Sequence, residues 1–247
     1  MKTLLTSLAT ASVAASAAAQ DAKPVAPASA PLFSDITLTE NVGVYDKKGD
    51  TSTVAALNTL LGVKAIGLDW HLLAPVYVSD ASGYGSIELG TSWDALKDAA
   101  FLGSKTTVSV EGGLWMPTGS ANYENTELAP HIGAAALMNW GEWSFNQTFD
   151  WRFVTGSMYD PLLDRFSTDL ATAVSSLDYK WSDTVKFGVD FGQYYFVDGG
   201  GTVLITPNVE WTPAQSVVVS GGVGVPVWQD LAVENNLVVN AGVSFKF

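Results

Sequence analysis

The stretch WGEWSFNQTFDWRF, residues 140–153, alternates between two kinds of side chain. From Trp143 to Phe153 every second residue is aromatic except Gln147, and the residues between them are polar or charged. Successive side chains of a β-strand point to opposite faces of the sheet, so this strand has one aromatic face and one polar face. A transmembrane β-barrel needs both faces, because one meets lipid and the other meets a polar interior.

The N-terminal segment has the features of an export signal. MKTLLTSLATASVAASAAAQ contains an early Lys, a short apolar stretch and the small-residue run Ala17–Ala19, which predicts cleavage after Ala19. We therefore expect a signal peptide at 1–19, a Pro/Ala-rich linker at 20–33 and an outer-membrane β-barrel at 34–247. No stretch reaches the ~18 apolar residues of a transmembrane helix, so strands are the expected means of crossing a membrane.

The composition limits the classes of function. Charged residues make up 15% of the chain and hydrophobic residues 47%, and the formal net charge is -13. The negative charge argues against nucleic acid as a partner. The chain has no Cys, which excludes disulfides and thiolate metal sites. No metal-ligand cluster or cofactor motif appears in the sequence, so we expect no metal and no cofactor.

The alternation of the opening stretch recurs along the chain in units of about ten residues separated by turn residues. It predicts an all-β, antiparallel, up-and-down barrel. Ten strands from Lys64 onward form an even set, and segments 36–45 and 53–61 would add a hairpin and make twelve. We predict twelve strands, with ten as the alternative. Only WDALKDAAFL, residues 93–102, has a competing helical period.

The connections predict which end of the barrel is which. Short connections at 141–142, 182–184 and 212–216 alternate with longer ones, as periplasmic turns alternate with external loops. Aromatic rings with one polar group suit the headgroup boundary. The aromatic residues beside the short turns and at the chain end predict an interfacial girdle, which consists of Trp140, Trp143, Trp181, Trp211 and Phe247.

The ending NLVVNAGVSFKF, residues 236–247, resembles the C-terminal strand of Gram-negative outer-membrane proteins. That resemblance implies location in the outer membrane, contact with its lipid, and recognition of Phe245 and Phe247 by the barrel-assembly machinery. GGLWMPTGS, residues 112–120, is similar to the Pro-Thr-Gly strand end of outer-membrane channels linked to aromatic-compound degradation. An ordinary strand end is the alternative reading of that triplet. A water-soluble β-sandwich would also alternate, but the export signal, the low charge and the terminal Phe247 favour the membrane barrel.

The inward faces carry the candidate functional residues. We expect five charged side chains near mid-height in the lumen, which are Asp69, Glu111, Asp150, Arg152 and Asp190. Their surplus of carboxylates over Arg152 predicts a narrow porin-like channel for small solutes that prefers cations, because a ring of like charge selects the opposite sign. His71 and Glu88 are expected nearer the outer end.

Other functions remain open at this point. The interior charges could pair and plug the barrel, so that it acts as a structural or adhesive protein through loops such as 156–169. A barrel-type hydrolase is the remaining alternative, but neither His71 nor His131 has a nucleophile fixed by its spacing. Gln147 on the aromatic face leaves an oligomer contact open.

Overall fold

The structure is a computed structural model that describes residues 33–48, 53–78, 82–120, 127–154, 156, 158–160, 162, 165–167, 169–197, 200–231 and 234–247. The predicted signal peptide and all of the predicted linker except Phe33 lie outside these residues. Within the described ranges, no helix is long and apolar enough to cross a membrane.

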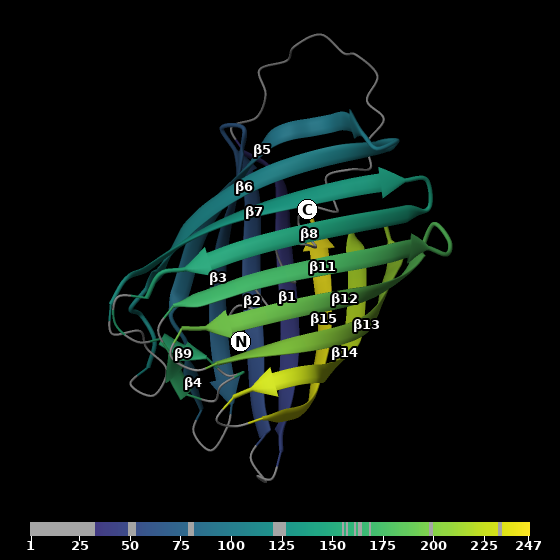
Figure 1. Cartoon of the computed structure of the whole chain (residues 1–247). Coiled ribbons are helices and arrows are strands. Elements are labelled where there is room, and N and C mark those ends of the chain that lie inside the picture. The colour runs from purple at the N-terminus through teal and green to yellow at the C-terminus, as the bar shows by residue number, and fades with distance from the viewer. Residues whose placement is uncertain are drawn as a thin grey trace.

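The described chain forms a closed antiparallel barrel (Figure 1). Its main sheet has thirteen strands, of which the short β4 (Ser82–Tyr84) pairs only with β3. The twelve strands of the barrel wall are β1 (Phe33–Lys47), β2 (Thr53–Ala65), β3 (Leu68–Val78), β5 (Ile87–Phe101), β6 (Ser104–Met116), β7 (Ala129–Trp140), β8 (Trp143–Arg152), β11 (Leu170–Lys180), β12 (Val185–Phe196), β13 (Gly200–Ala214), β14 (Val217–Asp230) and β15 (Asn235–Lys246). β1 pairs with both β15 and β2, and β2 pairs with β3, so the sheet of twelve wall strands closes on itself. The predictions of an up-and-down barrel and of twelve strands are confirmed.

The two ends of the barrel differ in their connections. At one end, called here the inner end, short turns join β2 to β3, β5 to β6, β7 to β8, β11 to β12 and β13 to β14. At the other, outer end the connections are mostly longer, and the connection from β8 to β11 spans residues 153–169. The C-terminus lies at the inner end beside the start of β1, where the backbone N–H of Phe247 donates to the carbonyl of Ile36 (2.9 Å).

The turn between β2 and β3 was missed in the sequence. The strand expected to begin near Lys64 begins at Leu68, and Ile66 and Gly67 form the turn. Both residues have positive φ, 57° and 76°, which two-residue hairpin turns of the right twist require. Branched residues such as Ile rarely adopt positive φ, so Ile66 concealed a turn that Gly67 alone indicated.

The segment with a competing helical period is a strand. Residues 93–101 belong to β5, and the pairing of β5 with β6 shifts between Asp94 and Leu96 and again between Leu96 and Ala99. Such β-bulges insert extra residues and break the period of two. The irregular spacing of apolar residues therefore reflects bulges.

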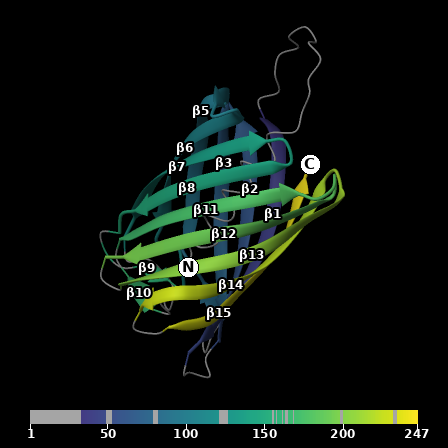
Figure 2. The ribbon, with the colours of Figure 1, turned by 45° about the vertical axis from the view of Figure 1, so that its right-hand side comes forward.

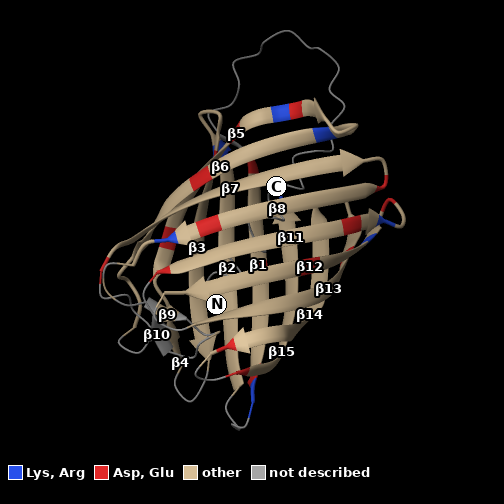
Figure 3. Cartoon of the chain, in the orientation of Figure 1, with Lys and Arg blue, Asp and Glu red and all other residues tan. Residues whose placement is uncertain are grey.

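Charged residues occupy few places along the strands of the wall (Figure 3). Large apolar side chains stay exposed on its outer face, for example Leu72, Phe149, Leu177 and Val189, at 37–44% of their surface. In contrast, polar and charged side chains such as His71, Thr148 and Asp190 are buried in the interior. This division is the one that lipid outside and a polar interior require.

Candidate functional site in the barrel interior

One group of ionisable side chains gathers on the interior face of neighbouring strands. We call it the histidine cluster, and its members are His71 on β3, Glu88 on β5, Glu111 on β6, His131 on β7, and Asp150 and Arg152 on β8. Glu88 and His131 stand near the starts of their strands and Arg152 is the last residue of β8, all toward the outer end. The cluster contains both histidines of the chain.

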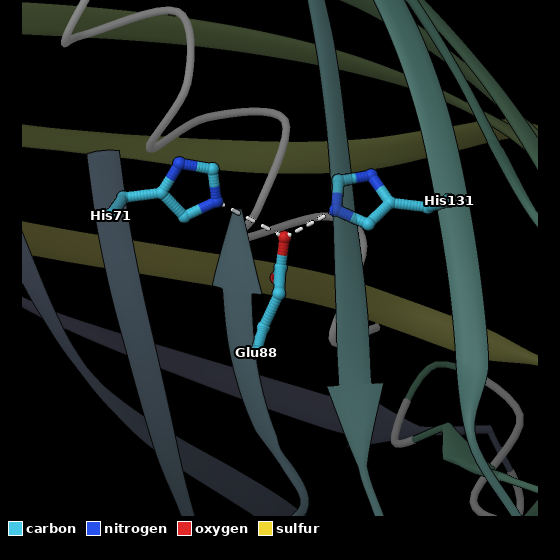
Figure 4. A group of neighbouring side chains, drawn as sticks. All are labelled: His71, Glu88 and His131. Atoms are coloured by element: carbon cyan, nitrogen blue, oxygen red, sulfur yellow. Dashed lines mark hydrogen bonds and ion pairs between the residues drawn. The ribbon is translucent and has the colours of Figure 1, made fainter. Parts of the chain in front are cut away.

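Glu88 is the centre of the cluster (Figure 4). Its Oε1 lies 3.1 Å from His71 Nε2, with which it shares a hydrogen bond, and 2.8 Å from His131 Nε2. The other ring nitrogen of His131, Nδ1, is hydrogen-bonded to Asp150 Oδ1 at 2.8 Å. Both imidazole rings therefore point at one carboxylate oxygen, and one ring is oriented by a second carboxylate.

Glycines on the neighbouring strands make room for the rings. A Cβ on Gly90 would overlap the His71 ring, and a Cβ on Gly113 would overlap His131 Nε2. In the same way, a Cβ on Gly133 would meet Glu111 Oε1 at 2.7 Å. These side chains can therefore lie flat against the wall because the neighbouring strand has a glycine at each point of contact.

The cluster is deeply buried and incompletely hydrogen-bonded. Glu88 is 0% exposed and His131 is 3% exposed. Glu88 Oε2 has no hydrogen-bond partner, and the short contact of His131 Nε2 with Glu88 does not have hydrogen-bond geometry. Arg152, 1% exposed, interacts electrostatically with Asp150 and Glu88. Buried polar atoms normally have a partner, and Glu88 Oε2 and His131 Nε2 are exceptions to that rule in this cluster.

A second group, called here the lysine cluster, lies on β11, β12 and β13. Lys186 Nζ is 3.2 Å from Glu210 Oε2 and 3.7 Å from Asp178 Oδ2, near the inner end. Asp190 stands deeper in the interior, 6% exposed, and accepts a hydrogen bond from Asn208 Nδ2 at 2.9 Å.

The predicted mid-height residues do not form one ring. Glu111 and Asp150 belong to the histidine cluster, whereas Asp190 belongs to the lysine cluster, and Asp69 lies 3.5 Å from Lys64. Arg152 ends β8 at the outer end instead of standing at mid-height. His71, Glu88 and His131, which no spacing in the sequence brings together, converge in the fold as a group that could hold a metal ion.

The residues of the predicted girdle lie at the inner end of the barrel. Trp140 and Trp143 face each other across the turn between β7 and β8, and Trp211 pairs with Val185 beside the turn after Trp181. Between 36% and 75% of each of these side chains and of Phe247 is exposed, and Phe245 is 36% exposed. The outer end carries further exposed aromatic residues, Tyr195 and Trp228, which the sequence prediction did not include.

The connection between β8 and β11 enters the outer mouth of the barrel. It contains the hairpin of β9 (Met158–Asp160) and β10 (Arg165–Ser167), at the ends of β12 to β14 in Figure 2. Tyr159 and Leu162 pack against interior residues from several barrel strands, including Tyr77. The carbonyl of Leu162 accepts hydrogen bonds from Lys47 Nζ (2.9 Å) and Asn235 Nδ2 (3.2 Å).

No family model matches the chain, and no sequence of a curated protein matches it. Solved structures with a similar fold do exist. The COG4313 outer membrane channel from Pseudomonas putida F1 is 12% identical with a TM-score of 0.68, over 92% of this chain and 100% of that one. The NanC porin is 10% identical with a TM-score of 0.57 (85% and 100% covered), and the KdgM porin 12% identical with 0.54 (85% and 99%). The chain therefore has the fold of these outer-membrane β-barrels.

Proposed function

We propose that this chain is a narrow outer-membrane channel for the passive diffusion of small solutes and that it prefers cations when it passes ions. The observation that carries the proposal is a closed barrel with an apolar outer face and an interior of polar and charged side chains. Isolated charge is costly to bury without water or a partner. The channels and porins with similar folds support the same function.

The charges of the interior favour cations. The histidine cluster holds Glu88, Glu111 and Asp150 against one permanent cation, Arg152. The lysine cluster repeats this surplus with three carboxylates against Lys186, namely Asp178, Asp190 and Glu210. Screening is weaker in a confined interior than at the surface, so these carboxylates repel anions.

Planar-bilayer conductance of the purified protein tests the proposal. We expect discrete channels whose reversal potential in a salt gradient indicates cation preference. Replacing Glu111→Gln and Asp150→Asn together should move the reversal potential toward anions. Asp183→Asn is the control, because the Asp183 side chain is 95% exposed in an inner turn, and it should have little effect. Repeated reconstitution of folded protein without any conductance would refute the channel.

The connection between β8 and β11 supports a second candidate, a barrel plugged at its outer mouth. Tyr159 and Leu162 are buried against the barrel interior instead of packing only within their own loop. Deleting residues 156–167 and measuring conductance separates the two functions. If the connection constricts a channel, its deletion should increase the conductance. If it plugs the barrel, conductance should appear only after the deletion. A parallel adhesion assay that alone shows a loss would indicate a partner site.

The remaining functional expectations are parts of the same proposal. We propose that Trp140, Trp143, Trp181, Trp211 and Phe247 sit at the inner headgroup boundary, and that Phe245 and Phe247 guide assembly by the barrel-assembly machinery. We propose no catalytic role, since His71 and His131 lie against the carboxylates of Glu88 and Asp150.

A further inference from the structure

We propose that the histidine cluster binds one divalent transition-metal ion, such as Zn²⁺, through His71 Nε2, Glu88 Oε1 and His131 Nε2. These three atoms lie within 4.8 Å of one another and come from β3, β5 and β7. Two imidazole nitrogens and one carboxylate oxygen form a known zinc ligand set, in which a fourth position stays open for water or another donor.

The distances suit a site that closes around an ion with small movements. Zinc lies about 2.0–2.2 Å from nitrogen and oxygen ligands, so ligand atoms in a tetrahedral site are roughly 3.3 Å apart. Glu88 Oε1 is now 3.1 Å from His71 Nε2 and 2.8 Å from His131 Nε2. The two contacts of Glu88 Oε1 need to lengthen by a few tenths of an ångström, and the two imidazole nitrogens, which lie within 4.8 Å of each other, need to come to the same separation by side-chain rotation.

Asp150 prepares His131 for this role. A carboxylate on Nδ1 holds the proton there, which leaves the lone pair of Nε2 free to bind a metal. The contact of Asp150 Oδ1 with His131 Nδ1 at 2.8 Å has this arrangement. Asp150 is therefore a positioning residue that orients the ring and selects its tautomer.

The unsatisfied atoms independently indicate a missing ligand. Glu88 is fully buried, its Oε2 has no hydrogen-bond partner, and His131 Nε2 is short of a hydrogen bond although it lies close to Glu88. A cation between these groups would give His131 Nε2 the partner that it lacks, and ligation by both oxygens of Glu88 would also satisfy Oε2. If Glu88 served only as the acceptor for two histidines, neither of these two atoms would need to lack a hydrogen-bond partner.

The cluster also has more carboxylates than permanent cations. Glu88, Glu111 and Asp150 contribute three carboxylates, and Arg152 is the one permanent cation among them. Such a surplus attracts a cation. Protons on the two histidines are the competing occupants, and metal binding should release them.

Metal binding to the untagged full-length protein, folded in detergent, tests the proposal without any need for conductance. Isothermal titration with Zn²⁺ near neutral pH should give one site per chain, with release of protons, and Mg²⁺ should not replace zinc. Glu88→Gln and His131→Asn should each weaken binding at least tenfold. Asp190→Asn, a buried interior carboxylate outside the cluster, is the matched control and should bind zinc like the parent protein.

A pair of glycine variants tests the site without changing any ligand, in case the ligand variants fail to fold. Gly113→Ala should weaken zinc binding, because its Cβ would displace His131 Nε2, although no ligand is changed. Gly112→Ala, on the opposite face of β6, meets only the His131 carbonyl at 3.6 Å and should leave binding intact. Heat-modifiable gel migration would confirm that each barrel is folded. No binding by the folded parent, or binding that Glu88→Gln and Gly113→Ala leave unchanged, would overturn the site while leaving the proposed channel untouched.

Discussion

The two faces of β8 come from the same ten residues but differ in how their side chains find partners. On the outer face, the one polar residue, Gln147, bonds to the residue directly opposite on the next strand: Ser175 Oγ donates to Gln147 Oε1 at 2.6 Å. On the inner face, Asp150 reaches His131, which is offset in register, and through it Glu88 on a strand further round the wall.

This difference separates what the sequence of one strand determines from what the closed barrel determines. Alternation along the strand determines which side chains face lipid, and it holds for every residue of β8. Contacts across the interior depend on strand tilt and register, which bring distant residues together in the closed barrel. The inner face therefore contains the charged cluster, and the outer face contains isolated local bonds.

The largest predicted effect lies on the inner face. Arg152→Met should lower the free energy of unfolding by about 3–5 kcal/mol, because it removes the permanent cation from a buried group of carboxylates. Reversible urea unfolding in lipid vesicles, with a chelator present, measures the change. Lys180→Met at the inner turn, where Lys180 pairs with Asp183 in solvent, is the control and should have no measurable effect. Equal results for both variants would mean that the interior solvates its charges as the surface does.

The outer face gives the next prediction. Phe149→Arg should cost roughly 2–4 kcal/mol if Phe149 stands near the bilayer midplane, and Trp143→Arg roughly 0–1 kcal/mol near the interface. Phe149 is 44% exposed within β8, and Trp143 starts β8 at the inner end. The same unfolding experiment applies. A greater cost at Trp143 would show that the assignment of depth along β8 is wrong.

Most of the wall could be predicted from the sequence, because the strand period is a local property. The alternation around Phe149 and Leu72 assigned the outer face, and segments 36–45 and 53–61 were recognised as the added hairpin. One lipid-facing exception was overlooked: Glu40 on β1 accepts a hydrogen bond from Thr59 Oγ1 (2.9 Å to Oε2) on the outer face.

The histidine cluster could not be predicted because no local pattern encodes it. His71, Glu88 and His131 meet only after β3, β5, β6 and β7 take their registers, with His71 opposite Gly90 and His131 opposite Gly113. Glycines in strands commonly mark a close approach of another group. The inward glycines at 90 and 113 were therefore the one sequence feature that indicated the cluster. They show that another side chain fits against the strand there, but they do not identify that side chain.

The smallest predicted effect tests whether Gln147 is satisfied within its own chain. The side-chain amide donates to the carbonyl of Val174 (3.2 Å) and accepts from Ser175, so it needs no second protein copy. Gln147→Leu should cost about 1 kcal/mol, since it leaves the Ser175 hydroxyl without its acceptor at the lipid face. Adding Ser175→Ala should recover part of this loss, and the double-mutant cycle should give a coupling energy of about 0.6 kcal/mol, typical of hydrogen bonds in membranes. If instead Gln147→Leu dissociates an oligomer in analytical ultracentrifugation, and Ser175→Ala does not restore stability, Gln147 is a contact between copies and the outer face is more than a lipid surface.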